Sequence, residues 1–192
     1  MSRKNYKNYL FWQGLITLLL LLLISGIFSQ FWGNTSLASV STQSATVISV
    51  VDGDTLNVKM TQCRLPINNN SQQCRIRLAC IDTPERGQNP FYQQAKDRLI
   101  ELLPRGTNIT VKDTDTTAGN RIVAEIFRGR NSINIQMVKE GKAVVYCKHL
   151  NVCSDSRNSL LSTEAAARKA GLGVWNPQQS WTQSRENHPC RN

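Results

Sequence analysis

The 192-residue sequence predicts an α+β fold, a small β-barrel of five short strands that carries helices, preceded by an apolar N-terminal segment. Two observations predict this class. Short β-branched runs are separated by turn residues, with connections mostly too short for parallel crossovers. One other segment repeats apolar residues at helical spacing, and two more carry the signals of a helix end. Hydrophobic residues at 40% and charged residues at 19% exclude a wholly disordered chain, and a single long apolar stretch excludes a multi-span membrane protein.

The expected strands follow from local signals. The run 45–51 is β-branched and apolar, and the turn Asp52-Gly53-Asp54 joins it to 55–60 as a hairpin. A third strand ends at Asp82-Thr83-Pro84-Glu85, because proline removes a ladder donor. A polar loop, 113–120, is expected between the last two strands. The five expected strands are 45–51, 55–60, 74–81, 107–112 and 121–128.

Three helices are expected, at about 90–103, 134–141 and 156–170. In the first, Phe91, Ala95 and Leu99 recur at helical spacing, and Pro104-Arg105-Gly106 ends the run. Asn134 is expected to cap the second helix. Gly171 ends the third helix, and a tryptophan is expected to dock just beyond it.

The N-terminal segment predicts export. Its basic residues, the last of them Lys7, precede an uncharged interval that lasts until Asp52 and contains an apolar block at 15–28. This pattern fits a signal peptide, and the uncharged window 9–28 is also long enough for a membrane anchor. Both alternatives stay open, and either places the rest of the chain outside the cytoplasm. The expected divisions are a signal or anchor at 1–28, a linker at 29–44, a domain at 45–176 and a polar tail at 177–192.

The six cysteines agree with export, because an even number in an exported chain indicates disulfides. Zinc is the competing interpretation, but the sequence has no Cys-x-x-Cys. Cys80 lies within an expected strand and is interpreted as a small buried apolar residue, which leaves Cys190 unpaired. The pairs expected from proximity in the sequence are Cys63–Cys74 and Cys147–Cys153.

Charged residues at strand ends indicate a chemistry. Asp54, Asp82 and Glu85 lie where loops present functional groups, and clustered carboxylates with a carbonyl suit Ca²⁺ and, less strictly, Mg²⁺. Arg77 and Arg121 could each hold two phosphoryl oxygens. A metal, a carboxylate for the water and cationic donors are what phosphodiester hydrolysis requires. The net charge of +10 favours a polyanionic partner. By spacing alone, a metal-binding module is about as well supported as an enzyme.

Taken in order, the motifs resemble the staphylococcal nuclease (thermonuclease) family. Val51-Asp52-Gly53-Asp54-Thr55 comes first, followed by Arg77-Leu78 and then by Ile81-Asp82-Thr83-Pro84-Glu85. Ile133-Asn134 with Met137-Val138 resembles the family's second-helix signature. The run from Ala165 that closes on Leu172-Gly173-Val174-Trp175 resembles its final helix and tryptophan. The similarity covers about residues 45–176.

The resemblance implies a five-stranded OB-fold barrel with three helices, which cuts DNA and RNA with Ca²⁺ and leaves 3′-phosphates. By position, it makes Asp54 and Asp82 the side-chain metal ligands and adds the carbonyl of Thr83. Glu85 would position or activate the attacking water. Asp52 would be a further acid near the metal.

The resemblance also assigns the two arginines and a nucleotide contact. Arg77 and Arg121 would bind the scissile phosphate and stabilise its transition state. The family's aromatic residue directly before the second arginine is absent here, and the glycine, Gly119, is displaced. The nucleotide-stacking tyrosine is displaced too, since Tyr146 lies near its position while Cys147 occupies it. Because each stacked base contributes roughly 1–3 kcal/mol, we expect weak substrate affinity or altered base preference.

Two other functions remain to be compared with a nuclease. One is a noncatalytic OB-fold module that binds nucleic acid or a partner protein. The other is an anchored surface protein that uses Ca²⁺ only for stability, which predicts metal binding without turnover. The enzyme is favoured because a binding module has no need of the metal carboxylates. A monomer is expected for so small a domain.

Overall fold

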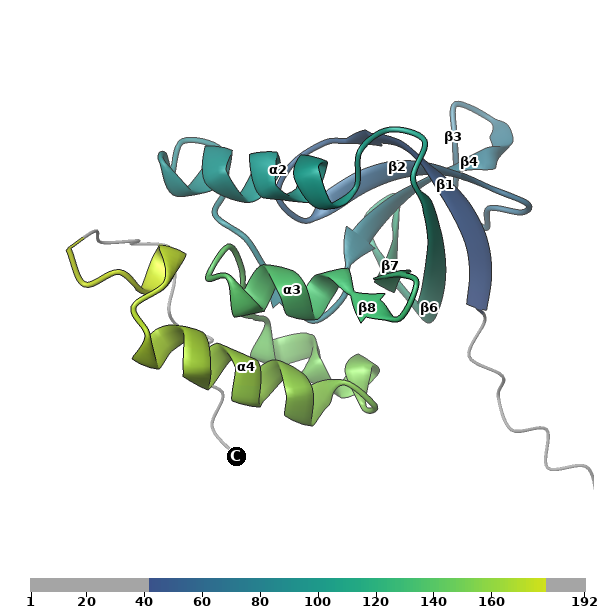
Figure 1. The fold of residues 1–192 in the computed structure, drawn as a ribbon. Coiled ribbons are helices and arrows are strands. Elements are labelled where there is room, and N and C mark those ends of the chain that lie inside the picture. Colours follow the sequence, from purple (N-terminus) through teal and green to yellow (C-terminus); the bar gives the residue numbers. More distant parts are fainter. Residues whose placement is uncertain (1–41, 179–192) are drawn as a thin grey trace, which may run out of the picture. The chain divides into compact units, whose positions relative to one another are not determined.

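The structure, a computed structural model, describes residues 42–178 (Figure 1). The predicted segment 1–28 with its anchor window 9–28, most of the linker 29–44 and most of the tail 177–192 lie outside the described residues. No helix within 42–178 is long and apolar enough to cross a bilayer.

Five strands close into the predicted barrel. They lie in the order β4-β2-β1-β6-β7, and β7 pairs with β4 to complete the ring. The closing pair is parallel, while the other neighbours in the ring are antiparallel. This closed five-stranded barrel with helices confirms the α+β OB-fold. The barrel strands are β1 (Thr42–Val50), β2 (Thr55–Met60), β4 (Asn70–Leu78), β6 (Asn108–Ala118) and β7 (Arg121–Arg128).

Shorter elements complete the domain. The strands β3 (Pro66–Ile67) and β8 (Asn131–Ser132) extend the barrel sheet, and β5 (Ile81–Asp82) pairs with β9 (Val144–Val145). The helix α3 packs against β7 and against α4 (Figure 1). The helices are α2 (Phe91–Leu102), α3 (Ile133–Lys139) and α4 (Arg157–Lys169), with short 3-10 helices η1 (Cys147–Cys153) and η2 (Gly173–Trp175).

The core lies inside the barrel and under the helices. Alternate residues of the strands point inward, and Leu56, Ile76 and Ile122 are fully buried or within 1% of it. The helices cover this interior with Leu99 from α2 and Met137 from α3, both with no exposed surface. Burying each such side chain stabilises the fold by roughly 1.5–3 kcal/mol.

Asn134 was predicted to cap α3, and this prediction is wrong. Ser132 caps this helix, accepting a hydrogen bond from Ile135 N at 3.3 Å. Asn134 is buried instead, because its amide satisfies backbone groups of the barrel: its Oδ1 accepts from Ile126 N at 2.9 Å, and its Nδ2 donates to Ala79 O at 2.9 Å. The side chain that the sequence placed at a helix end therefore joins α3 to the barrel.

The predicted loop 113–120 is also wrong, because β6 continues to Ala118 and only Gly119 and Asn120 separate it from β7. The polar residues of this extension pair with β7 across a register shift between Asp113 and Thr117. Thr114 Oγ1 donates to Val123 O at 2.8 Å, which satisfies a carbonyl within that irregular stretch.

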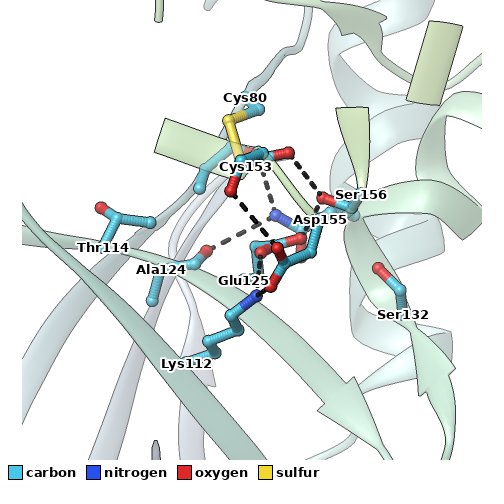
Figure 2. Close-up of polar contacts among 12 residues, drawn as sticks. Cys80, Lys112, Thr114, Ala124, Glu125, Ser132, Cys153, Asp155 and Ser156 are labelled. Carbon is cyan, nitrogen blue, oxygen red and sulfur yellow. Dashed lines mark hydrogen bonds and ion pairs between the residues drawn. A yellow bond between two sulfur atoms is a disulfide. The ribbon is translucent and has the colours of Figure 1, made fainter. Parts of the chain in front are cut away.

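The cysteines pair differently from the prediction, except for Cys63–Cys74, which forms as predicted. Cys80 is not in a strand but in the turn between β4 and β5, with φ of 62°. There it is disulfide-bonded to Cys153 at the end of η1 (Figure 2). Cys147 is also disulfide-bonded, so the Cys147–Cys153 pair and the buried thiol at Cys80 are both wrong. Proximity in the sequence failed because the barrel brings distant turns together.

A polar cluster around the buried Glu125 lies next to this disulfide (Figure 2). Glu125 of β7 is 1% exposed, and Lys112 Nζ lies 3.2 Å from its Oε1 and 2.8 Å from Asp155 Oδ2. Ser156 Oγ donates to Glu125 Oε2. The start of α4 is therefore fixed to the barrel wall by charged and polar contacts as well as by the disulfide beside it.

A second buried carboxylate predicts a pH effect on stability. Glu164 of α4 accepts from Val145 N at 2.6 Å. Burial raises the pKa of Glu164 above its ordinary value of 4.5, although the Val145 hydrogen bond and Arg168 act in the lowering direction. Because the pKa of Glu164 is higher in the folded than in the unfolded state, protonation of this residue stabilises the fold. This stabilisation is fully present below pH 4.5 and is lost as the pH rises through the folded-state pKa.

The variant Glu164→Gln keeps the acceptor oxygen and removes the ionisation. We therefore expect the free energy of unfolding of the variant, relative to the unmodified protein, to increase between ~pH 4 and ~pH 8. Urea unfolding at several pH values measures this difference, and distant titrating groups cancel in it. A difference that does not change with pH would contradict the prediction.

Candidate active site

The turn between β1 and β2 packs tightly against its surroundings. Asp54 N donates to Asp52 Oδ1 at 3.1 Å, and Leu78 N donates to Asp54 O at 2.7 Å, which ties the turn to β4. A Cβ on Gly53 would lie 2.8 Å from Ala95 Cβ and 2.9 Å from Thr83 Oγ1. Glycine is therefore required for this approach, and it leaves Asp54 buried with 3% of its surface exposed.

This close packing makes Gly53→Ala a sensitive variant. Overpacking of this kind costs roughly 1–3 kcal/mol, and it would displace the turn that carries Asp54. We expect a lower melting temperature together with a loss of the cleavage activity that the sequence predicts, measured by thermal unfolding and with an oligonucleotide substrate. Gly129→Ala is the control, because Gly129 has a positive φ but no neighbour within 4 Å of an added Cβ; it should lose stability and keep activity. Full activity in Gly53→Ala would contradict the argument.

Arg77 joins two of the predicted metal ligands. It lies near the end of β4, and its Nη1 donates to Asp54 Oδ2. Its Nη2 donates to Asp82 Oδ1 at 2.9 Å and to Ile81 O at 3.3 Å. The side chain is 14% exposed. Burial acts to lower the pKa of Arg77, but Asp54 and Asp82 outweigh it and raise the pKa, so the guanidinium stays charged.

Four acids come together around this arginine, and we name them the acidic cluster: Asp52, Asp54, Asp82 and Glu85. Burial raises the pKa of Asp54, with Arg77 opposing and Asp52 adding to the increase. Burial also raises the pKa of Glu85, and the three other members add to it. The mutual effect of these carboxylates means that negative charge is concentrated here.

The bend after β5 places the next two predicted residues. Thr83 is 3% exposed and lies against the Gly53 turn, while Glu85 keeps much of its surface in solvent and is only partly buried. Glu85 N donates to Gln88 Oε1 at 2.6 Å, and Gln88 N donates to Glu85 O at 3.0 Å. A short turn therefore fixes the backbone from which Glu85 projects.

Arg121 begins β7 and reaches the acidic cluster through a hydroxyl. Its Nη1 donates to Thr55 Oγ1 at 3.2 Å, and that hydroxyl donates to Asp54 Oδ1 at 3.0 Å. Its Nε donates to Ala118 O at 3.1 Å. The displaced glycine in the preceding turn therefore does not remove this arginine from the site.

An open cavity of about 580 Å³ brings these segments together. Arg77, Asp82, Glu85 and Arg121 line it, and so does Tyr146. Asp54 and Thr83 are buried beside the cavity and do not line its wall. Asp52 contacts Asp54 from the turn.

Sequence reasoning missed several cavity residues. His149 lines the wall, with its ring centroid 5.0 Å from that of Tyr146 and a 54° angle between the planes. Thr116 and Thr117 line it as well, but their segment was expected to be a loop. Thr55, which links Arg121 to Asp54, could have been suggested by its place directly after Asp54 in the sequence. The position of His149 depends on η1, which no pattern in the sequence predicted.

A family model described as staphylococcal nuclease homologue matches residues 75–177. The chain belongs to this family. Three relatives agree. A micrococcal nuclease from Shigella flexneri is 33% identical over 146 residues, covering 70% of this chain and 76% of that protein. An uncharacterized endonuclease from Haemophilus influenzae is 28% identical over 130 residues, covering 67% of this chain and 64% of that protein. Endonuclease YhcR from Bacillus subtilis is 28% identical over 140 residues, covering 66% of this chain and 11% of that protein.

These similarities support a nuclease, a hydrolase that acts on nucleic acid. The charges at the site of this staphylococcal nuclease homologue form two groups of opposite sign. The acidic cluster holds four carboxylates, whereas the cavity wall carries two guanidinium groups, those of Arg77 and Arg121. Both guanidinium groups are held in place by hydrogen bonds to other residues of the protein.

The donor set fits a hard divalent cation. Arg77 contacts one oxygen of each of two carboxylates, Asp54 Oδ2 and Asp82 Oδ1. The other oxygen of each carboxylate remains for a further partner, although Asp54 Oδ1 also accepts from the Thr55 hydroxyl. Within residues 42–178, no three His, Cys, Asp or Glu side chains are grouped so as to hold a metal by themselves. Ca²⁺ and Mg²⁺ commonly complete such a set with backbone carbonyls, water and substrate phosphate, and Thr83 lies beside this group.

Proposed function

We propose that this staphylococcal nuclease homologue is a Ca²⁺-dependent nuclease that hydrolyses DNA and RNA and leaves products with 3′-phosphates. The observation that carries the proposal is the cavity lined by Arg77, Asp82, Glu85 and Arg121, which come from separate segments of the chain. The family match and the net charge of +10 support nucleic acid as the substrate.

The two arginines have the role of binding and stabilising the phosphate. Each guanidinium offers paired donors that match phosphoryl oxygens. Arg77 and Arg121 are held in advance by their hydrogen bonds to Asp82 and Ala118. Donors fixed in this way stabilise charge that develops in the transition state at little reorganisation cost.

Glu85 has the role of general base. Its raised pKa, caused first by burial and then by the neighbouring acids, makes it a stronger base than an ordinary glutamate. Water would transfer a proton to Glu85 while its oxygen bonds to phosphorus. The bond from phosphorus to the 5′ oxygen breaks, solvent supplies a proton to that oxygen, and the phosphate stays on the 3′ side.

Ca²⁺ would be held by Asp54 and Asp82 with the carbonyl of Thr83. When bound, the cation supplies Lewis-acid withdrawal of charge from the phosphate. Asp52 would orient the turn through its hydrogen bond with Asp54 N. Arg77 holds Asp54 and Asp82 in place by its hydrogen bonds, and its charge opposes the burial that raises the pKa of Asp54.

The test uses the purified full chain with single-stranded DNA, duplex DNA and RNA oligonucleotides, in Ca²⁺, Mg²⁺ or chelator. We expect cleavage in Ca²⁺, none in chelator, and products that a polymerase extends only after phosphatase treatment. Glu85→Gln should lower kcat by roughly 10²- to 10⁴-fold while substrate still binds. Asp97→Asn, on the exposed face of α2, is the matched control.

The outcomes separate the alternatives. Binding without cleavage in every condition would leave the noncatalytic OB-fold module. Metal-dependent stability without turnover would leave the surface protein that uses Ca²⁺ structurally. Cleavage that Glu85→Gln does not affect would place the reaction elsewhere in the chain.

We also propose that the nuclease acts outside the cytoplasm as a monomer, either secreted or anchored through residues 9–28. The disulfides Cys63–Cys74 and Cys80–Cys153 support this location, because such bonds persist in oxidising compartments. Protease accessibility on intact cells, with fractionation of the membrane, tests the location. Sedimentation of the purified protein tests the oligomeric state.

A further inference from the structure

The strand β6 contains a bulge next to the cavity. Asp113 pairs with Ala124 and Thr117 pairs with Ile122, so residues 114–116 lie opposite the single residue Val123. Asp115, in the middle of the bulge, has a φ of 57°. Bulges bend a strand and change the direction of the residues beyond them. The path of the β6–β7 hairpin after this point therefore depends on how the bulge is held.

Arg64 holds this bulge from a distant segment. Its Nε and Nη2 donate to the two carboxylate oxygens of Asp113 at 2.8 and 2.9 Å. Its Nη2 also donates to Thr116 O at 2.6 Å. One guanidinium thus contacts both the start and the end of the bulge, and Asp113 Oδ1 in turn accepts from Asp115 N at 2.9 Å.

The position of Arg64 is itself fixed. It directly follows Cys63, whose disulfide with Cys74 joins it to β4, the strand that carries Arg77. The segment between the two cysteines also forms a small hairpin, in which Pro66 pairs with Cys74. The guanidinium of Arg64 is therefore presented to β6 from a cross-linked base.

The hairpin beyond the bulge carries a proposed catalytic group. Thr116, Thr117 and Ala118 line the cavity, and Ala118 pairs with Arg121 across the turn. Arg121 Nε donates to Ala118 O at 3.1 Å. A continuous series of contacts thus runs from Arg64 through the bulge to the guanidinium of Arg121.

We propose that Arg64 is a positioning residue for the nuclease reaction, which sets the placement of Arg121 by holding the β6 bulge. This inference rests on the proposed function. The side chain of Arg64 is 36% exposed but that of Asp113 only 10%, so this bidentate pair also contributes to folding. Stability alone does not account for the third hydrogen bond, to Thr116 O, with which Arg64 also fixes the direction of the strand beyond the bulge.

The kinetic test compares Arg64→Ala with Arg128→Ala. Arg128 also donates to a backbone carbonyl, that of Leu102 at 3.1 Å, and also lies on β7, at its far end from the cavity. Both variants remove one positive charge. We expect Arg64→Ala to lower kcat about 10- to 100-fold, the effect of a small misplacement of a catalytic group, with little change in KM. Its melting temperature should also fall, because the buried Asp113 loses its partner, so kcat is measured well below that temperature. Arg128→Ala should keep kcat.

A double variant tests whether the effect passes through Arg121. In the Arg121→Ala background, Arg64→Ala should cause no further loss of kcat, because the group that it positions is gone. The same fold-loss in both backgrounds would overturn the proposal. A rise in KM alone would also overturn it, because Arg64 would then be a phosphate contact.

Two conservative variants test the bidentate contact. Arg64→Lys keeps the charge but not the paired donors, so it should not restore kcat. Asp113→Asn should reproduce the loss and add nothing to Arg64→Ala. Full activity in Arg64→Lys, or in Asp113→Asn, would mean that the paired contact does not position Arg121.

An NMR measurement reads the coupling without turnover. The Nε–Hε signal of Arg121, assigned with Arg121→Lys, should shift or broaden in Arg64→Ala and stay in place in Arg128→Ala. An unchanged signal overturns the positioning role. If the unmodified protein does not cleave nucleic acid, the proposed nuclease fails, while this signal still decides whether Arg64 controls Arg121.

Discussion

Replacing Arg77 by lysine is expected to lower kcat/KM roughly 10²- to 10³-fold, the effect of losing an aligned transition-state donor. Lysine keeps the positive charge but cannot donate to two groups in a fixed plane. Arg77 now contacts Asp54, Asp82 and Ile81 O at once. Steady-state cleavage of a defined oligonucleotide in Ca²⁺ measures the change.

The control for this variant is Arg75→Lys. Arg75 lies two residues earlier on β4, so its side chain is on the same face, and its Nε donates to Asn57 Oδ1 at 3.1 Å away from the cavity. Equal activity of both lysine variants would show that charge alone suffices at position 77. An alanine variant is less informative, because removing one member of a buried ion pair costs about 3–5 kcal/mol of stability and would confuse misfolding with lost catalysis.

Removal of the Cys80–Cys153 disulfide is expected to cost about 4 kcal/mol in the free energy of unfolding. The two cysteines are 73 residues apart in the sequence, so the bond restricts a large part of the unfolded chain. The double variant Cys80→Ala/Cys153→Ala, compared with the unmodified protein by equilibrium urea unfolding, measures the loss.

The matched comparison is Cys63→Ala/Cys74→Ala, whose bond spans 11 residues and should contribute about 3 kcal/mol by the same relation. The longer loop should therefore give the larger loss. The Cys80 variant should also lose activity, because Cys80 lies between Arg77 and Asp82 on the cavity wall. A smaller loss of stability for the Cys80–Cys153 pair than for the Cys63–Cys74 pair would show that local strain or unfolded-state structure governs both.

The parts of the site that could be predicted from the sequence share one property: each is set by local signals. The Asp52-Gly53-Asp54 turn and the Thr83-Pro84 bend are encoded in consecutive residues, and the structure has both where they were expected. Arg77 was assigned from its place in one strand. Such features need no knowledge of which strands meet in the barrel.

The parts that were missed depend on contacts between distant segments. The extension of β6 has polar residues on both faces near its end, so it lacks the alternation that marks a half-buried strand. Cys80 and Cys153 meet only after β4, β5 and η1 are folded together. Arg64 lies in a polar insertion, where an arginine is ordinarily a solvated charge, and only the folded barrel brings it to Asp113.

The parallel pair of β4 and β7, which closes the barrel, determines at which stage of folding the molecule becomes active. Ile76 and Leu78 of β4 meet β7 at Ile122 and Ala124, so this parallel contact joins segments that are far apart in the chain. Closing long loops has an entropic cost that local contacts do not repay, and such pairings tend to form slowly. Arg77 and Arg121 lie on these same two strands. A chain with all its helices formed but with the ring still open would therefore have no phosphate site, and catalysis would begin with ring closure.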